Sequence, residues 1–552
     1  MKGRKNSSIR SYLTIVTAAA GIVATALIPP CDVLGIRLHR TVVLPGLIRF
    51  ESDEAESIVE YEADIERLEE QLAAIEVEEP TVPQPAADTL AQEPPVQTRF
   101  EMLFETPVGR GRIASVAEIE EGIAEDYVPI EDFDTLPHTR FEEFIDRMVD
   151  GQPVRIAFMG DSFIEGDILT ADLRDGLQRL FGGCGVGFVP CDIPFATSRK
   201  TVKRRSTGWD SYSIMKPKAA PGELRDLFFV SGYISHGGPG ADTRWQTATA
   251  YPTLDSCTTA RILLISRERS RIEVTLDDTL SSRFDITGDE ALREIRIDHP
   301  YRSVRMKIID GHAVCYGITM ESPDGVRLDN FSVRSNNGHA IFGTSPVINR
   351  EVDAVLGGYD LVVLQYGLNI MQPSQRNYTR YRDQLRDMIA YARRCFPRAA
   401  VLVMGVSDRC VKNAQSGAYE TVASAEALTA YQRAAADSCR VAFWDTRRAM
   451  QRYGGMKGFV SRRWAGGDYT HINYAGGRAV ARALLDAIRV QAAAARQELD
   501  IRQADEMQRM RIIAERYHRR DSIARAKVEV ISNMVDTIFD RAAEPITETR
   551  QM

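Results

Sequence analysis

The sequence predicts an α/β protein: a three-layer α/β/α fold around a parallel sheet, interrupted by an antiparallel β-sandwich, with an N-terminal membrane helix and a helical C-terminal extension. Three observations predict it. From about residue 140, apolar strand-like segments alternate with amphipathic helical stretches. Between about 205 and 335 the hydrophobic period drops to two. A single long apolar run lies near the N-terminus.

Composition sets the bounds of the prediction. The chain has 552 residues, of which 44% are hydrophobic and 26% charged. This is ordinary globular composition with room for two or three domains, and it excludes a wholly disordered protein or a polytopic transporter. The net charge of −8 gives no basic field for nucleic acid. Residues 51–79 alone carry a net charge of −12, so the acidity belongs to one segment.

Residues 1–30 have the pattern of an export signal. Four basic residues precede an apolar run from Tyr12 to Ile28, which Pro29 and Pro30 close. We favour an uncleaved anchor that holds the protein at the inner membrane by residues 12–28, although Ala24-Thr25-Ala26 offers a cleavage site. The positive-inside rule then places the rest of the chain in the periplasm, or more generally outside the cytoplasm.

Two helical segments and a linker lie outside the predicted catalytic region. Residues 51–79 carry apolar residues at coiled-coil spacing for under three heptads, which fits a short coiled coil or an isolated helix. Residues 80–108 are rich in proline and read as a linker. Residues 491–552 form a charged extension whose apolar heptad pattern predicts a long helix. Both helical segments need a surface to cover their apolar stripes, so we expect a protein partner or self-association, or, for the C-terminal helix, docking on the body of the protein.

The α/β region spans residues 140–204 and 336–490. A helix with leucines on one face follows the apolar strand Val154–Met159. Further strands are expected at Leu361–Gln365, Ala400–Met404 and Val441–Trp444, with helices between them. This alternation predicts a parallel sheet covered on both faces.

Residues 205–335 are expected to form the inserted sandwich. Arg271–Leu276 alternates apolar and polar residues, and about seven short strands without helices fit in the segment. The other strand candidates are Leu227–Val230, Arg261–Ile265, Leu292–Ile297, Val304–Ile308 and Ala313–Met320.

The eight cysteines show no zinc-like spacing and no CxxC pair. In an exported protein some could pair, and Cys184 with Cys191 is the closest couple in the sequence. Burial as small hydrophobic residues is the alternative.

Three small clusters follow predicted strands. Gly160-Asp161-Ser162 follows the first strand, and Gly367-Leu368-Asn369 follows another. Asp468-Tyr469-Thr470-His471 follows the last. Because the carboxyl ends of parallel strands meet at one edge of the sheet, we expect these side chains to lie together.

The chemistry of these residue types points to a serine nucleophile. A carboxylate three residues before His471 can reach its Nδ1 atom, which leaves Nε2 to take a proton from Ser162. The amide of Asn369 can donate to an oxyanion. Glu165, Asp167 and Asp172, close to Ser162, are interpreted as carboxylates at the start of a helix.

At these residues the chain resembles the SGNH (GDSL-type) hydrolase superfamily. Gly160-Asp161-Ser162 matches the nucleophile block, and Asn330–Gly338 resembles the second block, whose glycine donates a backbone N–H. Gly367-Leu368-Asn369 and Asp468-x-x-His471 match the third and last blocks. Phe163 and Ile370 depart from the usual residues at their positions. Gly160–Arg174, Phe181–Phe188 and Phe443–Thr446 resemble the bacterial peptidoglycan O-acetylesterase branch, in which a sandwich similar to a carbohydrate-binding module is inserted.

The resemblance implies a carbohydrate O-acetylesterase that acts on an O-acetylated glycan, with peptidoglycan as the expected substrate. Ser162, Asp468 and His471 would be catalytic, and Ser162, Gly338 and Asn369 would form the oxyanion hole. No metal or organic cofactor is implied. Two alternatives remain open: an O-acetyltransferase that uses the same serine, and a non-catalytic glycan-binding protein of the envelope.

Overall fold

A computed structural model describes residues 31–33, 36–38, 99–103, 112–195, 199–254, 257–413 and 415–518. The chain divides into two compact units, Met1–Pro94 and Pro95–Met552. In the first unit the described residues are a short antiparallel hairpin of β1 (Cys31–Val33) and β2 (Ile36–Leu38). The expected membrane helix at 12–28 and the acidic helix at 51–79 lie outside the described residues. Within the described residues, no helix combines the length and apolarity that a membrane crossing needs.

The second unit is built on the predicted parallel sheet. Its strand order is β15 (Val326–Ser332), β5 (Val154–Gly160), β16 (Leu361–Gln365), β17 (Ala400–Met404), β20 (Ala442–Trp444) and the short antiparallel β4 (Glu131–Asp132). The chain passes from β5 to β15 on one side and then to β16 on the other. The order therefore reverses at β5, and the carboxyl ends of β5 and β16 form the crevice where such sheets bind ligands.

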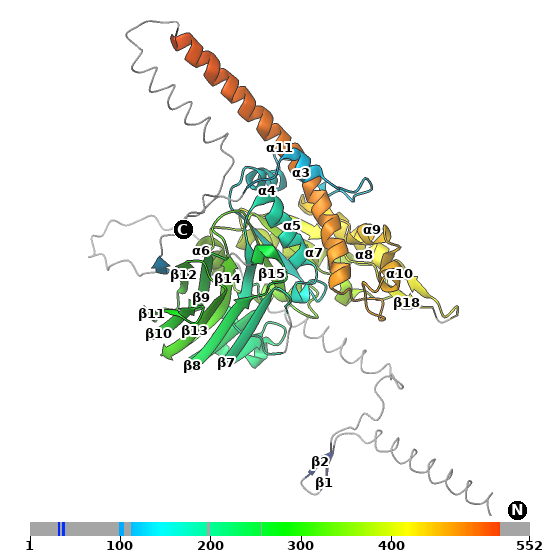
Figure 1. The fold of residues 1–552 in the computed structure, drawn as a ribbon. Helices are drawn as coiled ribbons and strands as arrows, with labels where there is room; N and C mark the ends of the chain where they lie inside the picture. The colour runs from blue at the N-terminus through cyan, green and yellow to red at the C-terminus, as the bar shows by residue number, and fades with distance from the viewer. Residues whose placement is uncertain are drawn as a thin grey trace, which may run out of the picture. The chain divides into compact units, whose positions relative to one another are not determined.

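Helices cover both faces of this sheet (Figure 1). One face packs against α4 (Arg140–Val149), α5 (Thr170–Phe181) and the first half of α11 (Tyr474–His518). The other packs against α6 (Pro346–Val355), α7 (Thr379–Cys395) and the C-terminal part of α8 (Ala423–Cys439). Coverage on both sides explains why β5, β16 and β17 are buried at every position. The short helices α3 (Val116–Glu120), α9 (Thr446–Gln451) and α10 (Gly455–Ser461) complete the helical elements.

The predicted insertion is antiparallel, but it forms one hydrogen-bonded sheet that folds over on itself. Strand β8 (Tyr233–Thr247) turns the corner: residues 235–237 pair with β14 and residues 242–246 pair with β13. A separate apolar core fills the space between the two halves of the folded sheet. The other strands are β6 (Gly185–Pro190), β7 (Val202–Ser213), β9 (Thr259–Ile265), β10 (Ser270–Leu276), β11 (Leu280–Ile286), β12 (Leu292–Asp298), β13 (Ser303–Asp310) and β14 (Ala313–Glu321).

The predicted boundaries of the insertion, 205–335, are wrong at both ends. Strand β6 and the start of β7 precede residue 205, and β15 belongs to the parallel sheet beside β5. No strand was expected at Val326–Ser332; its polar residues Asp329 and Asn330 are buried in the parallel sheet and hydrogen-bonded to residues distant in the sequence. The expected strand at Leu227–Val230 is also absent, since a 3₁₀ turn at Gly222–Leu227 leads into irregular backbone.

The predicted linker at 80–108 contains a strand. Arg99–Leu103 forms β3, which extends the inserted sheet by pairing parallel with β12. Arg99 Nε lies 2.9 Å from the buried carboxylate of Glu294. This pairing gives hydrogen-bond partners to the backbone of β12, which would otherwise be an open edge of the sheet. The proline content of residues 80–108 gave no indication of this strand.

The predicted boundary at residue 491 lies inside a helix. Helix α11 runs without interruption from Tyr474 to His518. Its apolar residues are buried against the body as far as Ala493, and Ala495 and Leu499 still pack there in part. Beyond Leu499 the described side chains are exposed, including Ile501 at 55%. The long helix is confirmed over this range, and residues 519–552 lie outside the description.

Of the seven cysteines whose side chains the structure describes, six are buried and Cys439 is half-buried, and none of the seven forms a disulfide. The alternative of burial as small hydrophobic residues therefore describes most of them.

A buried network of charges joins the two sheets. Arg155 of β5 is fully buried and contacts Asp329 of β15 at 2.7 Å and Glu321 of β14. Glu321 also faces Arg261 and Arg327. Burial alone would raise the pKa of Glu321, but the guanidinium groups of Arg155, Arg327 and Arg261 hold it below its usual range.

The body and the insertion also share an apolar core, which includes Met159 and Phe331 from the body and Leu263 and Tyr316 from the insertion. The insertion therefore has its own core and also shares a second core with the body, so the two parts are packed together over a continuous apolar contact.

Removing one member of this network should destabilise the whole second unit. We expect Glu321→Ala to lower the free energy of unfolding by about 3–5 kcal/mol, because it leaves a buried guanidinium short of a partner. The control is Arg283→Ala, which breaks an exposed 2.9 Å pair with Glu273 and should cost less than about 1 kcal/mol. Urea denaturation measures both values. Equal costs would contradict a structural role for the buried network.

Candidate active site

The predicted nucleophile lies on a tight turn at the carboxyl end of β5. Ser162 is half-buried and follows Gly160 by two residues. A Cβ atom on Gly160 would lie 2.9 Å from both the Gln365 side chain and the Ile164 side chain, so the turn can pass here only with glycine. Asp161 Oδ1 accepts the backbone N–H of Phe163 at 2.9 Å and closes the turn.

Asp161 itself is fully buried. Burial raises its pKa to about 7, against the opposing effects of the Phe163 N–H and the nearby His471. Its Oδ2 accepts a hydrogen bond from Asn369 Nδ2 at 3.0 Å. Asp161 therefore connects the first and second of the three sequence clusters beside Ser162.

The predicted Asp–His pair is confirmed as a geometric unit. His471 Nδ1 lies 2.6 Å from Asp468 Oδ2, and Asp468 Oδ1 accepts the backbone N–H groups of Thr470 and His471, each at 3.1 Å. Partial burial alone would raise the pKa of Asp468, but these hydrogen bonds leave it below its usual range. The carboxylate therefore stays ionised and orients the imidazole.

The loop that carries His471 is held from both sides. Tyr469 has a left-handed backbone (φ 54°), and its ring stacks on Tyr419 with centroids 3.7 Å apart. After the loop, Tyr474 donates its hydroxyl to Gly166 O at 3.0 Å, which joins the start of α11 to the nucleophile turn. A Cβ atom on Gly477 would lie 1.9 Å from Ile168 O, so only glycine permits this close approach. These contacts bring the His471 loop to the sheet edge that carries Ser162.

The two further oxyanion donors predicted from the sequence lie beside this turn, and both are engaged with Asn336. Asn369 Nδ2 donates to Asn336 O at 2.9 Å as well as to Asp161. The N–H of Gly338 donates to Asn336 Oδ1 at 2.8 Å. The oxyanion roles of Gly338 and Asn369 stay predictions, and each requires its donor to exchange a protein acceptor for the substrate.

Asp167, interpreted from the sequence as a helix-start carboxylate, has a different role. It is fully buried, has a left-handed backbone (φ 63°), and accepts hydrogen bonds from Arg174, Arg199, Thr170, Thr201 and Asn330. Burial alone would raise the pKa of Asp167, but Arg174 and Arg199 hold it far below its usual range. Asp167 thus fastens the nucleophile turn to α5, β15 and the insertion. Its partners lie up to 163 residues away, so no local pattern could have revealed them.

No group of three or more His, Cys, Asp or Glu side chains that could hold a metal ion is found in the described part of the chain. The site as built consists of a serine, an imidazole oriented by a carboxylate, and amide donors. These groups can carry out nucleophilic acyl transfer.

Comparisons with known proteins agree with this geometry at the level of fold. No protein-family model matches the chain, and no curated protein matches it by sequence. A solved structure described as "Peptidoglycan O-acetylesterase in action" aligns with a TM-score of 0.54 at 18% identity, over 66% of this chain and 99% of that one.

Other similar structures include a family two carbohydrate esterase from Cellvibrio japonicus, with 10% identity and a TM-score of 0.23 over 53% of this chain and 98% of that one. An acetyl xylan esterase aligns with 18% identity and a TM-score of 0.23 over 29% of this chain and 79% of that one. The fold of this chain is thus similar to that of a solved peptidoglycan O-acetylesterase, which agrees with the fold that the resemblance in the sequence implied.

The site predicts that Ser162 reacts with a serine-directed phosphonate. Asp468→Asn should slow labelling by about 10²–10⁴-fold, because the amide no longer holds His471 in the tautomer that accepts the serine proton. Mass spectrometry of the labelled peptide measures the rate, and Ser162→Ala is the unlabelled control. Labelling that is as fast in Asp468→Asn as in the wild type would contradict the role of Asp468 in orienting His471.

The raised pKa of Asp161 predicts a pH-dependent stability. Between about pH 4 and pH 7 the native state holds a proton that the unfolded state has lost, so the free energy of unfolding falls as the pH rises, by up to about 1.4 kcal/mol per pH unit. Asp161→Asn removes this titration. Urea denaturation at pH 4.5 and 7.5 should therefore show the variant gaining stability relative to the wild type at the higher pH. A pH-independent difference would mean that Asp161 is ionised throughout this range.

Proposed function

We propose that the protein is an exported serine esterase that removes O-acetyl groups from a cell-envelope glycan, with peptidoglycan as the substrate. The observation that supports the proposal is the surroundings of Asp161, the residue before Ser162 at the carboxyl end of β5. Asn369 donates to it, and the imidazole of the Asp468–His471 pair lies near enough to act on its pKa. The similar fold of a peptidoglycan O-acetylesterase supports the choice of glycan.

The reaction follows from the roles of these groups. His471 Nε2 takes the hydroxyl proton of Ser162 as Ser162 Oγ attacks the acetyl carbonyl, and Asp468 stabilises the imidazolium that forms. His471 then protonates the departing sugar oxygen, which leaves an acetyl-serine. Water, deprotonated by His471, attacks this ester and releases acetate.

In this proposal Asn336 accepts the hydrogen bonds of the oxyanion-hole donors until the substrate replaces it. Its backbone and side-chain oxygens accept from Asn369 and Gly338 before the reaction. As negative charge develops on the carbonyl oxygen, that oxygen becomes a stronger acceptor than a neutral amide oxygen, and the donors can move to it together with the Ser162 N–H.

Export rests on the N-terminal pattern. The basic residues and the apolar run at 12–28 support anchoring at the inner membrane with the catalytic unit in the periplasm. An envelope glycan is the substrate that such a placement makes accessible.

The decisive experiment is acetate release from O-acetylated peptidoglycan compared with O-acetylated xylan. We expect faster release from peptidoglycan. Ser162→Ala should lower kcat by about 10³–10⁶-fold and Asn369→Ala by about 10²–10³-fold. The control, Ser461→Ala on the exposed surface of α10, should match the wild type.

Equal rates in wild type and Ser162→Ala would overturn the esterase proposal. Transfer of acetyl to an oligosaccharide in place of release as acetate would identify an acetyltransferase instead.

A further inference from the structure

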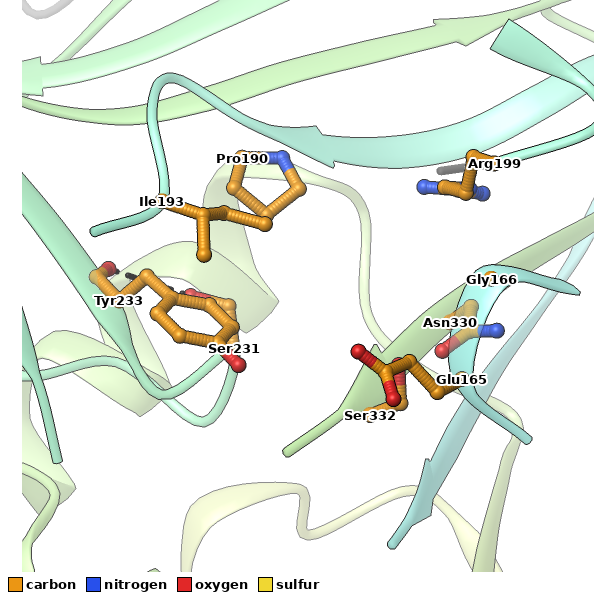
Figure 2. A pocket seen from close by; sticks show the side chains of 9 residues that line it. All are labelled: Glu165, Gly166, Pro190, Ile193, Arg199, Ser231, Tyr233, Asn330 and Ser332. Atoms are coloured by element: carbon orange, nitrogen blue, oxygen red, sulfur yellow. Dashed lines mark hydrogen bonds between the residues drawn. The ribbon is translucent and has the colours of Figure 1, made fainter. Parts of the chain in front are cut away.

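The insertion carries a cavity of its own, apart from the one beside the nucleophile turn. The cavity beside Ser162 is small and opens where the body and the insertion meet, with Glu165 on one side and Pro190 on the other (Figure 2). The cavity on the insertion is larger, about 180 Å³, and none of its residues has a role in the chemistry proposed above. Strands β7, β8 and β13 line it with Arg205, Ser206, Thr207, Asp242, Arg244 and Arg305.

The three arginines of this cavity stand side by side on the outer face of the insertion. Arg244 of β8 lies in register with Arg205 of β7 on one side and with Arg305 of β13 on the other. Thr243 and Trp245, which flank Arg244 in β8, are buried, so the arginine row faces away from the core. Since neighbouring strands are about 4.8 Å apart, the row spans only about 10 Å. Side chains as long as arginine can therefore meet at one ligand.

Such a row of like charges is unfavourable without counter-charges. Two of the arginines have one. Arg305 Nε donates to Asp242 Oδ2 at 2.7 Å, and Arg244 Nη1 donates to Asp278 Oδ1 at 2.8 Å. Arg205 is exposed, and in the described part of the chain no carboxylate forms an ion pair with it. The row is therefore left with one uncompensated guanidinium group.

The charge beside Arg205 is positive as well. Lys203 lies two residues before it on the same face of β7 and is also exposed. The residue in register with Lys203 is the neutral Gln246. An anion placed between Arg205 and its neighbours would thus relieve a repulsion that the protein itself leaves in place.

The shape of the site favours a phosphate group over a carboxylate. A carboxylate presents two oxygens, which a single guanidinium fork satisfies, whereas a phosphate monoester presents three strong acceptor oxygens. Neighbouring guanidinium groups and the exposed Thr207 hydroxyl offer donors from several directions. At 10–15 Å³ per water the cavity has room for about twelve waters, which is enough for a phosphate group and the first atoms of the molecule that carries it.

We propose that this cavity binds the phosphate group of a phosphate ester. Arg205 donates to two of the phosphate oxygens. Arg305, which uses Nε and Nη2 for Asp242, donates from Nη1. The rest of the ester extends into solvent. The insertion then has a binding role that does not depend on the reaction proposed for Ser162.

The first test is a titration of glycerol 3-phosphate with the full chain, followed by the width of the phosphorus NMR line. Arg205→Gln should raise the dissociation constant at least about fivefold, because it removes the uncompensated charge and its fork of donors. Asp242→Asn should lower it by about two- to fivefold, because a carboxylate that repels the phosphate is gone. Thermal melts establish that each variant is folded.

The matched control is Arg283→Gln, which removes the same charge from an exposed position of the insertion outside the cavity. It should bind within about twofold of the wild type. Equal binding by wild type and Arg205→Gln overturns the proposal. An equal loss in Arg205→Gln and Arg283→Gln also overturns it, because the attraction would then belong to the net charge and not to the cavity.

Competition against bound glycerol 3-phosphate tests the chemistry and the source of the phosphate. Glycerate, which carries a carboxylate in place of the phosphate, should need at least about tenfold higher concentration to displace the probe, and equal displacement overturns the choice of phosphate. Stronger displacement by monomeric dihexanoylphosphatidylglycerol assigns the site to a lipid head group, and stronger displacement by glucose 1-phosphate assigns it to a soluble phosphate monoester. Displacement by neither overturns the proposal.

Discussion

The burial of Arg155 is the constraint on which the rest of the structure depends. A guanidinium group in the middle of β5 cannot stay buried unless carboxylates accompany it, and the chain supplies Asp329 from the adjacent strand and Glu321 from the insertion. Tyr359 and the backbone of Phe188 satisfy the remaining acceptor positions of Asp329 at 2.7 and 2.8 Å. The parallel sheet alone would leave Arg155 with one of its two carboxylate partners, and the inserted sheet supplies the second.

A second buried carboxylate extends this constraint to the nucleophile. Asp167 sits a few residues after Ser162 and gathers Arg174 from α5, Asn330 from β15 and Arg199 from the segment that leads into the insertion. The turn that carries Ser162 is thus fastened on three sides. The His471 loop is exposed by comparison, with 58% of the imidazole side chain accessible. A fastened nucleophile turn and an accessible imidazole fit the proposed reaction, in which a polymeric substrate approaches from solvent.

The same contacts place residues of the insertion close to the nucleophile turn. The network at Glu321 and the shared apolar core bring β6 and the start of β8 beside the nucleophile turn, and the cavity beside Ser162 exists only because both parts line it. The Gly338 N–H and the Asn369 amide, which donate to Asn336, lie beside the nucleophile turn. In the proposed reaction they need only small shifts to bind an oxyanion, without a rearrangement of the sheet.

The sequence by itself determined the alternation of strands and helices, the serine turn after β5, the pairing of Asp468 with His471 and the antiparallel insertion. Each of these depends on residues that are close together in the chain: an apolar run, a glycine before a serine, a carboxylate three residues from a histidine. Only the tertiary structure decided that β15 joins the parallel sheet, that β3 extends the inserted one, and that Asp167, Asn330 and Asn336 organise the site. Their partners come from distant parts of the chain, and the sequence does not distinguish a polar residue that is buried and hydrogen-bonded from one that is solvated.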